Sequence, residues 1–87
     1  MTAKVLAQAL ADVIAEFYRA KDIYPPMNSA HEGWAVLREE VDELWDEIKA
    51  KECTRNHDRL RKEAVQVAAV AVRFVIDVCD SKGGGTK

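Results

Sequence analysis

Six carboxylates lie within nine residues of this chain, between Glu39 and Glu47. At 100° per residue, Glu40, Glu43 and Glu47 follow one line along the margin of the apolar face of a helix. No Lys or Arg lies between them, so their charges repel one another. An oxygen-seeking cation such as Mg²⁺ or Mn²⁺ relieves such repulsion. The spacing favours a cation site, and the alternative is a solvated acidic helix.

A second polar group lies further along the chain, at Glu63 and Gln66. These residues begin the polar stripe of a stretch that is otherwise almost entirely apolar, and polar groups on a buried helix need partners. Antiparallel packing across the short connection at residues 53–57 brings them opposite Glu40 and Glu43. The sequence therefore predicts that the two polar groups meet between two neighbouring helices.

Three helices must position these groups. Apolar periodicity predicts them over residues 3–21, from 29 to about 51, and from about 56 to 80. The Pro25-Pro26 pair interrupts the chain between the first two, because it removes amide donors and fixes an extended backbone. The predicted caps are Thr2, then Ser29 with Glu32 in a capping box, then either Asn56 or Asp58. Trp34 and Trp45 lie in the apolar arc of the second helix, which favours packing over stacking on a base.

The third helix is apolar nearly all round, and two other helices hardly suffice to cover it. The chain has 87 residues and a mass of 9.7 kDa, enough for one domain, predicted over 1–80 with a flexible tail over 81–87. A domain of this size is only marginally stable alone. We expect Cys53 to be exposed and Cys79 to be buried, with no disulfide scaffold. Assembly into a homodimer or homotetramer is the expected source of additional stability.

Charge and hydropathy exclude several classes of partner. Thirteen basic and fifteen acidic residues give a formal charge of −2, which argues against binding of a nucleic-acid polymer. The sequence contains no signal peptide and no apolar span of membrane length, so we expect a cytoplasmic protein with no membrane partner.

The pattern Glu-Glu-x-x-Glu over residues 39–43, followed by Glu-x-x-Gln over residues 63–66, resembles the MazG-type nucleoside triphosphate pyrophosphohydrolases over about residues 29–80. The resemblance implies an all-α, oligomeric NTP pyrophosphatase-like bundle that converts an NTP or dNTP to the monophosphate and pyrophosphate. It also implies Mg²⁺, or alternatively Mn²⁺, as cofactor. The implied metal ligands are Glu40, Glu43, Glu63 and Gln66, the last standing where the family has Asp.

Further roles follow from this resemblance. Glu39 or Glu47 would orient the attacking water, and the phosphates would contact basic residues, for which the candidates are Lys49, Arg59, Lys62 and Arg73. For Arg73 an i, i+4 ion pair with Asp77 is the simpler interpretation. Because Gln66 removes one negative charge, a catalytically weak or inactive nucleotide-binding or oligomerisation module is the alternative. A helical adaptor without a ligand is the third possibility.

Overall fold

The computed structural model describes residues 2–50 and 52–83, and every regular element in that part of the chain is helical. The elements are α1 (Ala3–Ile23), α2 (Ala30–Ile48), the short 3₁₀ helix η1 (Glu52–Thr54), α3 (His57–Phe74) and the π-helical continuation η2 (Val75–Gly83). The predicted all-α fold is confirmed. The last helix ends three residues beyond the predicted boundary at Asp80, and residues 84–87 of the predicted tail lie outside the described residues.

The helix starts are set by local capping. Thr2 Oγ1 accepts a hydrogen bond from the Val5 amide, and Asn56 Oδ1 accepts one from the Arg59 amide. Ser29 Oγ accepts from the Glu32 amide at 3.0 Å, as the capping box requires. In a capping box the glutamate usually accepts a hydrogen bond from the amide of the cap residue, here Ser29. Here Glu32 Oε1 instead accepts from the amide of the preceding residue, Asn28. Each cap satisfies an amide that lacks a partner inside its helix.

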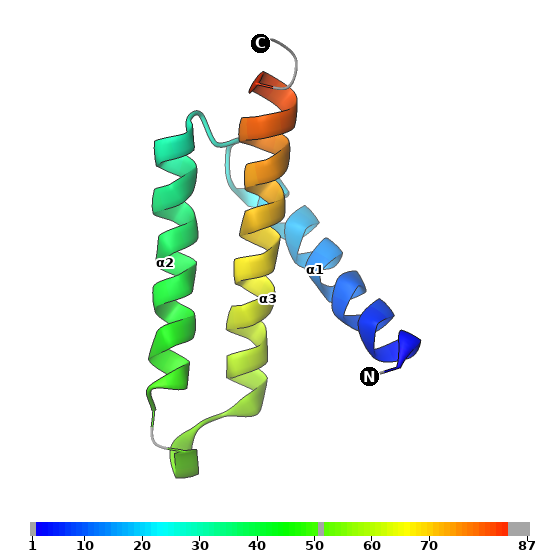
Figure 1. Ribbon diagram of the computed structural model, residues 1–87, viewed down its shortest axis with the longest axis vertical. Coiled ribbons are helices and arrows are strands. Elements are labelled where there is room, and N and C mark those ends of the chain that lie inside the picture. Colours follow the sequence, from blue (N-terminus) through cyan, green and yellow to red (C-terminus); the bar gives the residue numbers. More distant parts are fainter. Residues whose placement is uncertain (1, 51, 84–87) are drawn as a thin grey trace.

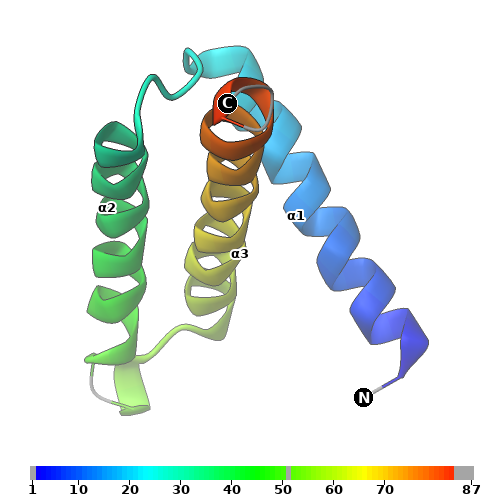
Figure 2. The same cartoon turned by 45° about the horizontal axis from the view of Figure 1, so that its top comes forward.

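Helix α3 lies between α1 and α2 and packs against both (Figures 1 and 2). Helices α2 and α3 run antiparallel, as predicted, and α1 diverges from them at its N-terminal end (Figure 2). The buried apolar residues of the described chain lie where α3 meets the end of α1 and the loop that follows it: Ala20, Met27, Ala69 and Val70.

The loop that joins α1 to α2 is hydrogen-bonded to the end of α3 and the beginning of η2. Arg73 donates a hydrogen bond to the Pro25 carbonyl at 3.3 Å and lies over the ring of Tyr24, while Asp77 accepts one from the Met27 amide at 3.0 Å. Arg73 and Asp77 thus each bind the loop, where the sequence favoured an ion pair between them. The reason is that Pro25 and Pro26 end α1 and leave backbone groups that need partners.

Large apolar side chains are exposed on the outer faces of all three helices. The half-exposed tryptophans Trp34 (55%) and Trp45 (54%) do not lie in the core of the single chain, because α3 covers only part of the predicted apolar arc of α2. Cys53 is exposed as expected, whereas the prediction that Cys79 is buried is wrong. The radius of gyration is 14.6 Å, against about 12 Å for a compact domain of this length. No described helix is both long and apolar enough to cross a membrane.

Candidate metal centre

Three carboxylates from two helices converge in the middle of the α2–α3 pair. Glu40 and Glu43 come from α2 and Glu63 comes from α3, and one oxygen of each lies within 4.8 Å of the others. Glu40 and Glu43 share a helix face because they are three residues apart. The antiparallel packing of α3 then brings Glu63 opposite them. The predicted encounter of the two polar groups is therefore confirmed.

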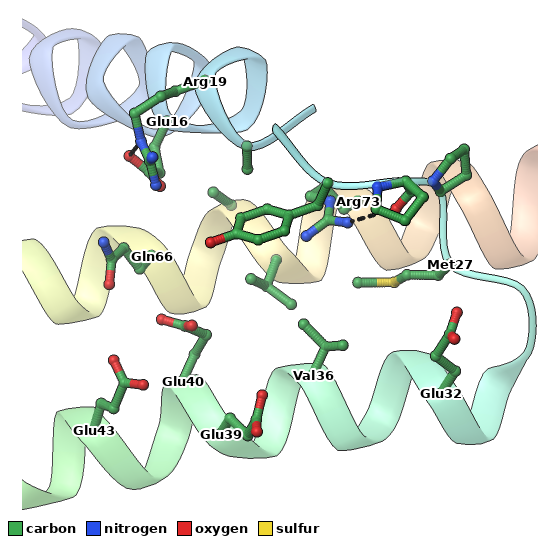
Figure 3. Close-up of a pocket in the computed structure, with 16 residues that line it drawn as sticks. Glu16, Arg19, Met27, Glu32, Val36, Glu39, Glu40, Glu43, Gln66 and Arg73 are labelled. Carbon is green, nitrogen blue, oxygen red and sulfur yellow. Dashed lines mark hydrogen bonds and ion pairs between the residues drawn. The ribbon is translucent and has the colours of Figure 1, made fainter. Parts of the chain in front are cut away.

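Gln66 completes this group one turn after Glu63. With its amide nitrogen turned toward the carboxylates, Gln66 donates to Glu40 Oε1 at 3.1 Å and to Glu63 Oε1 at 3.0 Å. In the opposite orientation, drawn in Figure 3, its amide oxygen faces the carboxylates. Carboxylate and amide oxygens at such distances repel one another unless a cation lies among them. The same side chain can thus serve as hydrogen-bond donor without a cation or as an oxygen ligand with one.

The electrostatics of the cluster disfavour three ionised carboxylates. Partial burial raises the pKa of Glu40, and the neighbouring charges of Glu43 and Glu63 raise it further. The pKa of Glu63 is also raised, first by partial burial and then by Glu43. Both effects act against the charged form. A bound divalent cation would remove this penalty, and hard oxygen donors of this kind suit Mg²⁺ or Mn²⁺.

Gln66→Asp is expected to destabilise the metal-free protein and to strengthen the binding of Mg²⁺. Without the cation, the melting temperature should fall, because two hydrogen bonds are lost and a like charge is added. With the cation, affinity should rise about tenfold, corresponding to about 1.4 kcal/mol. Titration calorimetry with Mg²⁺ measures the second effect. Gln8→Asp is the matched control, since Gln8 also donates to a carboxylate, that of Asp12, on exposed α1. Unchanged Mg²⁺ affinity would remove Gln66 from the ligand set.

The raised pKa of Glu40 predicts how Glu40→Gln depends on pH. A carboxyl with a raised folded-state pKa keeps its proton longer in the folded protein, so its contribution to the free energy of unfolding decreases as pH rises from the usual value of 4.5. In metal-free solution, Glu40→Gln should therefore melt a few degrees above the wild type at pH 7, and this gain should disappear below the usual carboxyl pKa. Thermal melts across this range test the expectation; an equal gain at every pH would contradict it.

The cluster lies at one end of a cavity of about 510 Å³ between α1, α2 and α3 (Figure 3). Such a volume is within the range of small-molecule sites. Apolar side chains, among them Met27, Val36 and Val70, line the rest of it together with Glu32, Glu39 and Arg73. A charged group at the cluster and an uncharged, flat group beside these apolar side chains would both find suitable surroundings in this one cavity.

The other predicted site residues lie at different places. Glu39 lines the cavity, and Glu47 lies near enough to raise the pKa of Glu63 but pairs with Arg59 at 3.4 Å. Lys49 pairs with Asp46 on the surface. Of the remaining basic candidates, Lys62 lines a separate, smaller pocket, and the buried Arg73 lines the main cavity with its guanidinium bonded to the loop.

Two residues that line the cavity were not predicted as site residues from the sequence. Glu16 and Arg19 project from α1 toward the cluster (Figure 3) and line the cavity. Arg19 donates to Glu16 through both Nε and a terminal nitrogen. The Arg19 guanidinium lowers the pKa of Glu16, and the Glu16 carboxylate raises the pKa of Arg19. In sequence they form an ordinary i, i+3 surface pair, and only the path of α1 across α3 shows that they face the acids.

Comparison with protein-family models, with curated proteins and with solved structures finds no match for this chain. The resemblance to the MazG-type enzymes therefore rests only on the sequence pattern at residues 39–43 and 63–66.

Proposed function

We propose that this protein is a Mg²⁺-dependent nucleoside triphosphate pyrophosphohydrolase of the house-cleaning type, converting an NTP or dNTP to the monophosphate and pyrophosphate. One observation carries the proposal: Glu40, Glu43 and Glu63 converge from two helices, and two of them, Glu40 and Glu43, line a cavity whose wall also contains apolar side chains. A nucleotide combines a polyphosphate, which needs cations, with a flat base, which needs an apolar surface. The arrangement supports the family resemblance of the sequence.

Glu40, Glu43, Glu63 and Gln66 would hold the metal ion. When bound, Mg²⁺ supplies neutralisation of charge at the phosphate oxygens and a lowered pKa of the attacking water. Glu39, which is exposed and lines the cavity, would accept the proton of that water, and Glu47 is the other candidate for this role. Attack of the water at the α-phosphorus forms the monophosphate and breaks its bond to the bridging oxygen, which leaves with pyrophosphate.

Thermal melting with and without Mg²⁺ or Mn²⁺, combined with a pyrophosphate-release assay over a panel of NTPs and dNTPs, tests the proposal. We expect the cation to raise the melting temperature, because a ligand that binds only the folded state stabilises it. We also expect release of pyrophosphate from at least one nucleotide. An absence of any response to either cation would overturn the metal centre and leave the helical adaptor.

A catalytically inactive nucleotide-binding module is the second candidate, and Gln66 favours it. With its nitrogen turned toward them, the amide donates to two carboxylates without any cation, at 3.1 Å and 3.0 Å, so two members of the cluster have a hydrogen-bond donor in the metal-free protein. The same experiment separates the two candidates. Stabilisation by the cation and by nucleotide without pyrophosphate release would establish the binding module.

We further propose that the chain assembles as a homodimer or homotetramer in the cytoplasm. Exposed apolar side chains of α2, including Trp34, Val41, Trp45 and Ile48, form a stripe that one chain leaves uncovered. Contiguous exposed apolar surface of this kind marks an interaction site. The extended shape of the single chain agrees with this proposal.

Trp45→Glu is expected to shift the assembly toward monomers, because it places a charge in the apolar stripe. Light scattering coupled to size-exclusion chromatography measures the mass of wild type and variant. Asp46→Lys, at an exposed neighbouring position outside the stripe, is the control and should leave the mass unchanged. A wild-type protein that elutes with the 9.7 kDa mass of one chain at all concentrations would contradict the proposal.

A further inference from the structure

The main cavity has an excess of negative charge. Five glutamates line it (Glu16, Glu32, Glu39, Glu40 and Glu43), against two arginines, Arg19 and Arg73. A triphosphate is itself strongly anionic, so its binding there requires cations from the protein as well as from solution. A basic side chain that binds the phosphates must line the cavity and be free to leave its present partner.

Arg73 is unsuited to this task. Its side chain is 6% exposed, donates to the Pro25 carbonyl and lies over the ring of Tyr24. Withdrawing it would break the hydrogen bond to the Pro25 carbonyl and the contact with the Tyr24 ring.

The basic residues around the α2–α3 connection are also engaged elsewhere. Lys49 and Arg59 pair with Asp46 and Glu47, and neither lines the cavity. Arg61 pairs with Asp12 and lines the smaller pocket.

Arg19, in contrast, both lines the main cavity and is accessible to a ligand. It lines the main cavity from α1, across from Glu40 and Glu43 on α2 (Figure 3), and its side chain is 51% exposed. Its guanidinium already binds a carboxylate in two-point fashion, through Nε and a terminal nitrogen to the two oxygens of Glu16. Phosphate offers the same paired oxygen geometry, for which the planar guanidinium is suited.

We infer that Arg19 binds the phosphate chain of the substrate, exchanging the Glu16 carboxylate for phosphate oxygens, so that a triphosphate is held between α1 and the acids of α2 and α3. This inference rests on the proposed function. Glu16 keeps a compensating charge after the exchange, because Lys62 lies close enough to lower its pKa and lines the smaller pocket with it. Glu16 therefore competes with the substrate for Arg19 and weakens binding.

The probe is inorganic tripolyphosphate, which has the phosphate chain without a base, titrated by calorimetry into protein saturated with Mg²⁺. Arg19→Gln should weaken its binding at least about tenfold, as expected for the loss of a charge-assisted contact. Arg38→Gln is the matched control, because Arg38 is exposed on α2, does not line the main cavity, and its loss changes the net charge by the same amount. The control should bind within about twofold of wild type. The Mg²⁺-dependent rise in melting temperature should be the same in all three proteins, because Arg19 contacts phosphate and not the metal.

Glu16→Gln should change the affinity for tripolyphosphate in the opposite direction from Arg19→Gln. It frees Arg19 and should tighten tripolyphosphate binding about threefold or more, whereas a merely structural role of the pair predicts weaker binding. In the Arg19→Gln background this gain should be lost, which separates release of Arg19 from a general reduction in negative charge. Equal affinity of Arg19→Gln and wild type would overturn the role of Arg19 while leaving the proposed function intact. No binding of tripolyphosphate by the Mg²⁺-stabilised wild type would overturn both.

Discussion

Glu43→Gln combined with Glu63→Gln is expected to abolish the Mg²⁺-dependent rise in melting temperature and to lower the rate of pyrophosphate release at least about 10³-fold. The double variant leaves Glu40 as the one charged member of the cluster, and a hard dication needs several oxygen ligands of high charge. Loss of a single preorganised electrostatic contact already costs about 10²- to 10³-fold in rate. Thermal melts with and without Mg²⁺ and the release assay on the same samples measure both effects.

The double variant should remain folded, and this makes the result interpretable. Without a cation it should melt at or above the wild type, since two repelling charges are gone. Asp42→Asn with Asp46→Asn is the control, because it removes the same number of charges from exposed positions of α2. That variant should keep the Mg²⁺ response. If both pairs of substitutions behaved alike, net charge and not the cluster would control cation binding.

Gly33→Val is expected to lower the free energy of unfolding by about 3 kcal/mol, through overpacking between α2 and α3. A Cβ at Gly33 would lie 2.5 Å from Phe74 Cδ2, 2.7 Å from Phe74 Cε2 and 3.2 Å from Met27 Sδ. These distances are too short for carbon atoms, so the helices or the ring must move. For a domain of this size the loss corresponds to a fall in melting temperature of more than about 10 °C.

Gly33→Ala separates sterics from helix propensity. Alanine gains about 1 kcal/mol over glycine inside a helix, so a variant with free space around the new methyl group would be more stable than the wild type. We expect it to be less stable, and we expect Phe74→Leu to reduce the cost in a double-mutant cycle, because leucine leaves room beside residue 33. A stabilised Gly33→Ala variant would show that α2 and α3 separate at little cost.

Local chemistry in the sequence determined most of the secondary structure. Thr2, Ser29 and Asn56 each accept a hydrogen bond from an amide three residues later, and the two prolines end the first helix. These are interactions within a few residues, so composition and spacing are sufficient to predict them. The end of the last helix was less predictable: its continuation is π-helical and reaches Gly83, the first of three glycines in the sequence, whereas the predicted end was Asp80.

The core of the candidate site was also predictable, for a related reason. The connection between α2 and α3 is short, so the two helices must run antiparallel, and the spacing of three residues then brings Glu63 and Gln66 to the face that carries Glu40 and Glu43. The prediction assumed only that α2 and α3 pack antiparallel, and it did not depend on the position of α1.

What only the tertiary structure decided is the position of α1. Its path across α3 depends on contacts between residues far apart in the chain: Arg61 with Asp12, Arg73 with Pro25, and Asp77 with Met27. That path makes the cavity and brings Arg19 to the acids. The spacing of residues fixes which side chains share a face of one helix, but the rotation of that helix relative to a distant one is set by packing and hydrogen bonds that spacing does not specify. For this reason the sequence determined the acidic cluster, whereas the cavity and the arginine that faces the cluster appeared only in the folded chain.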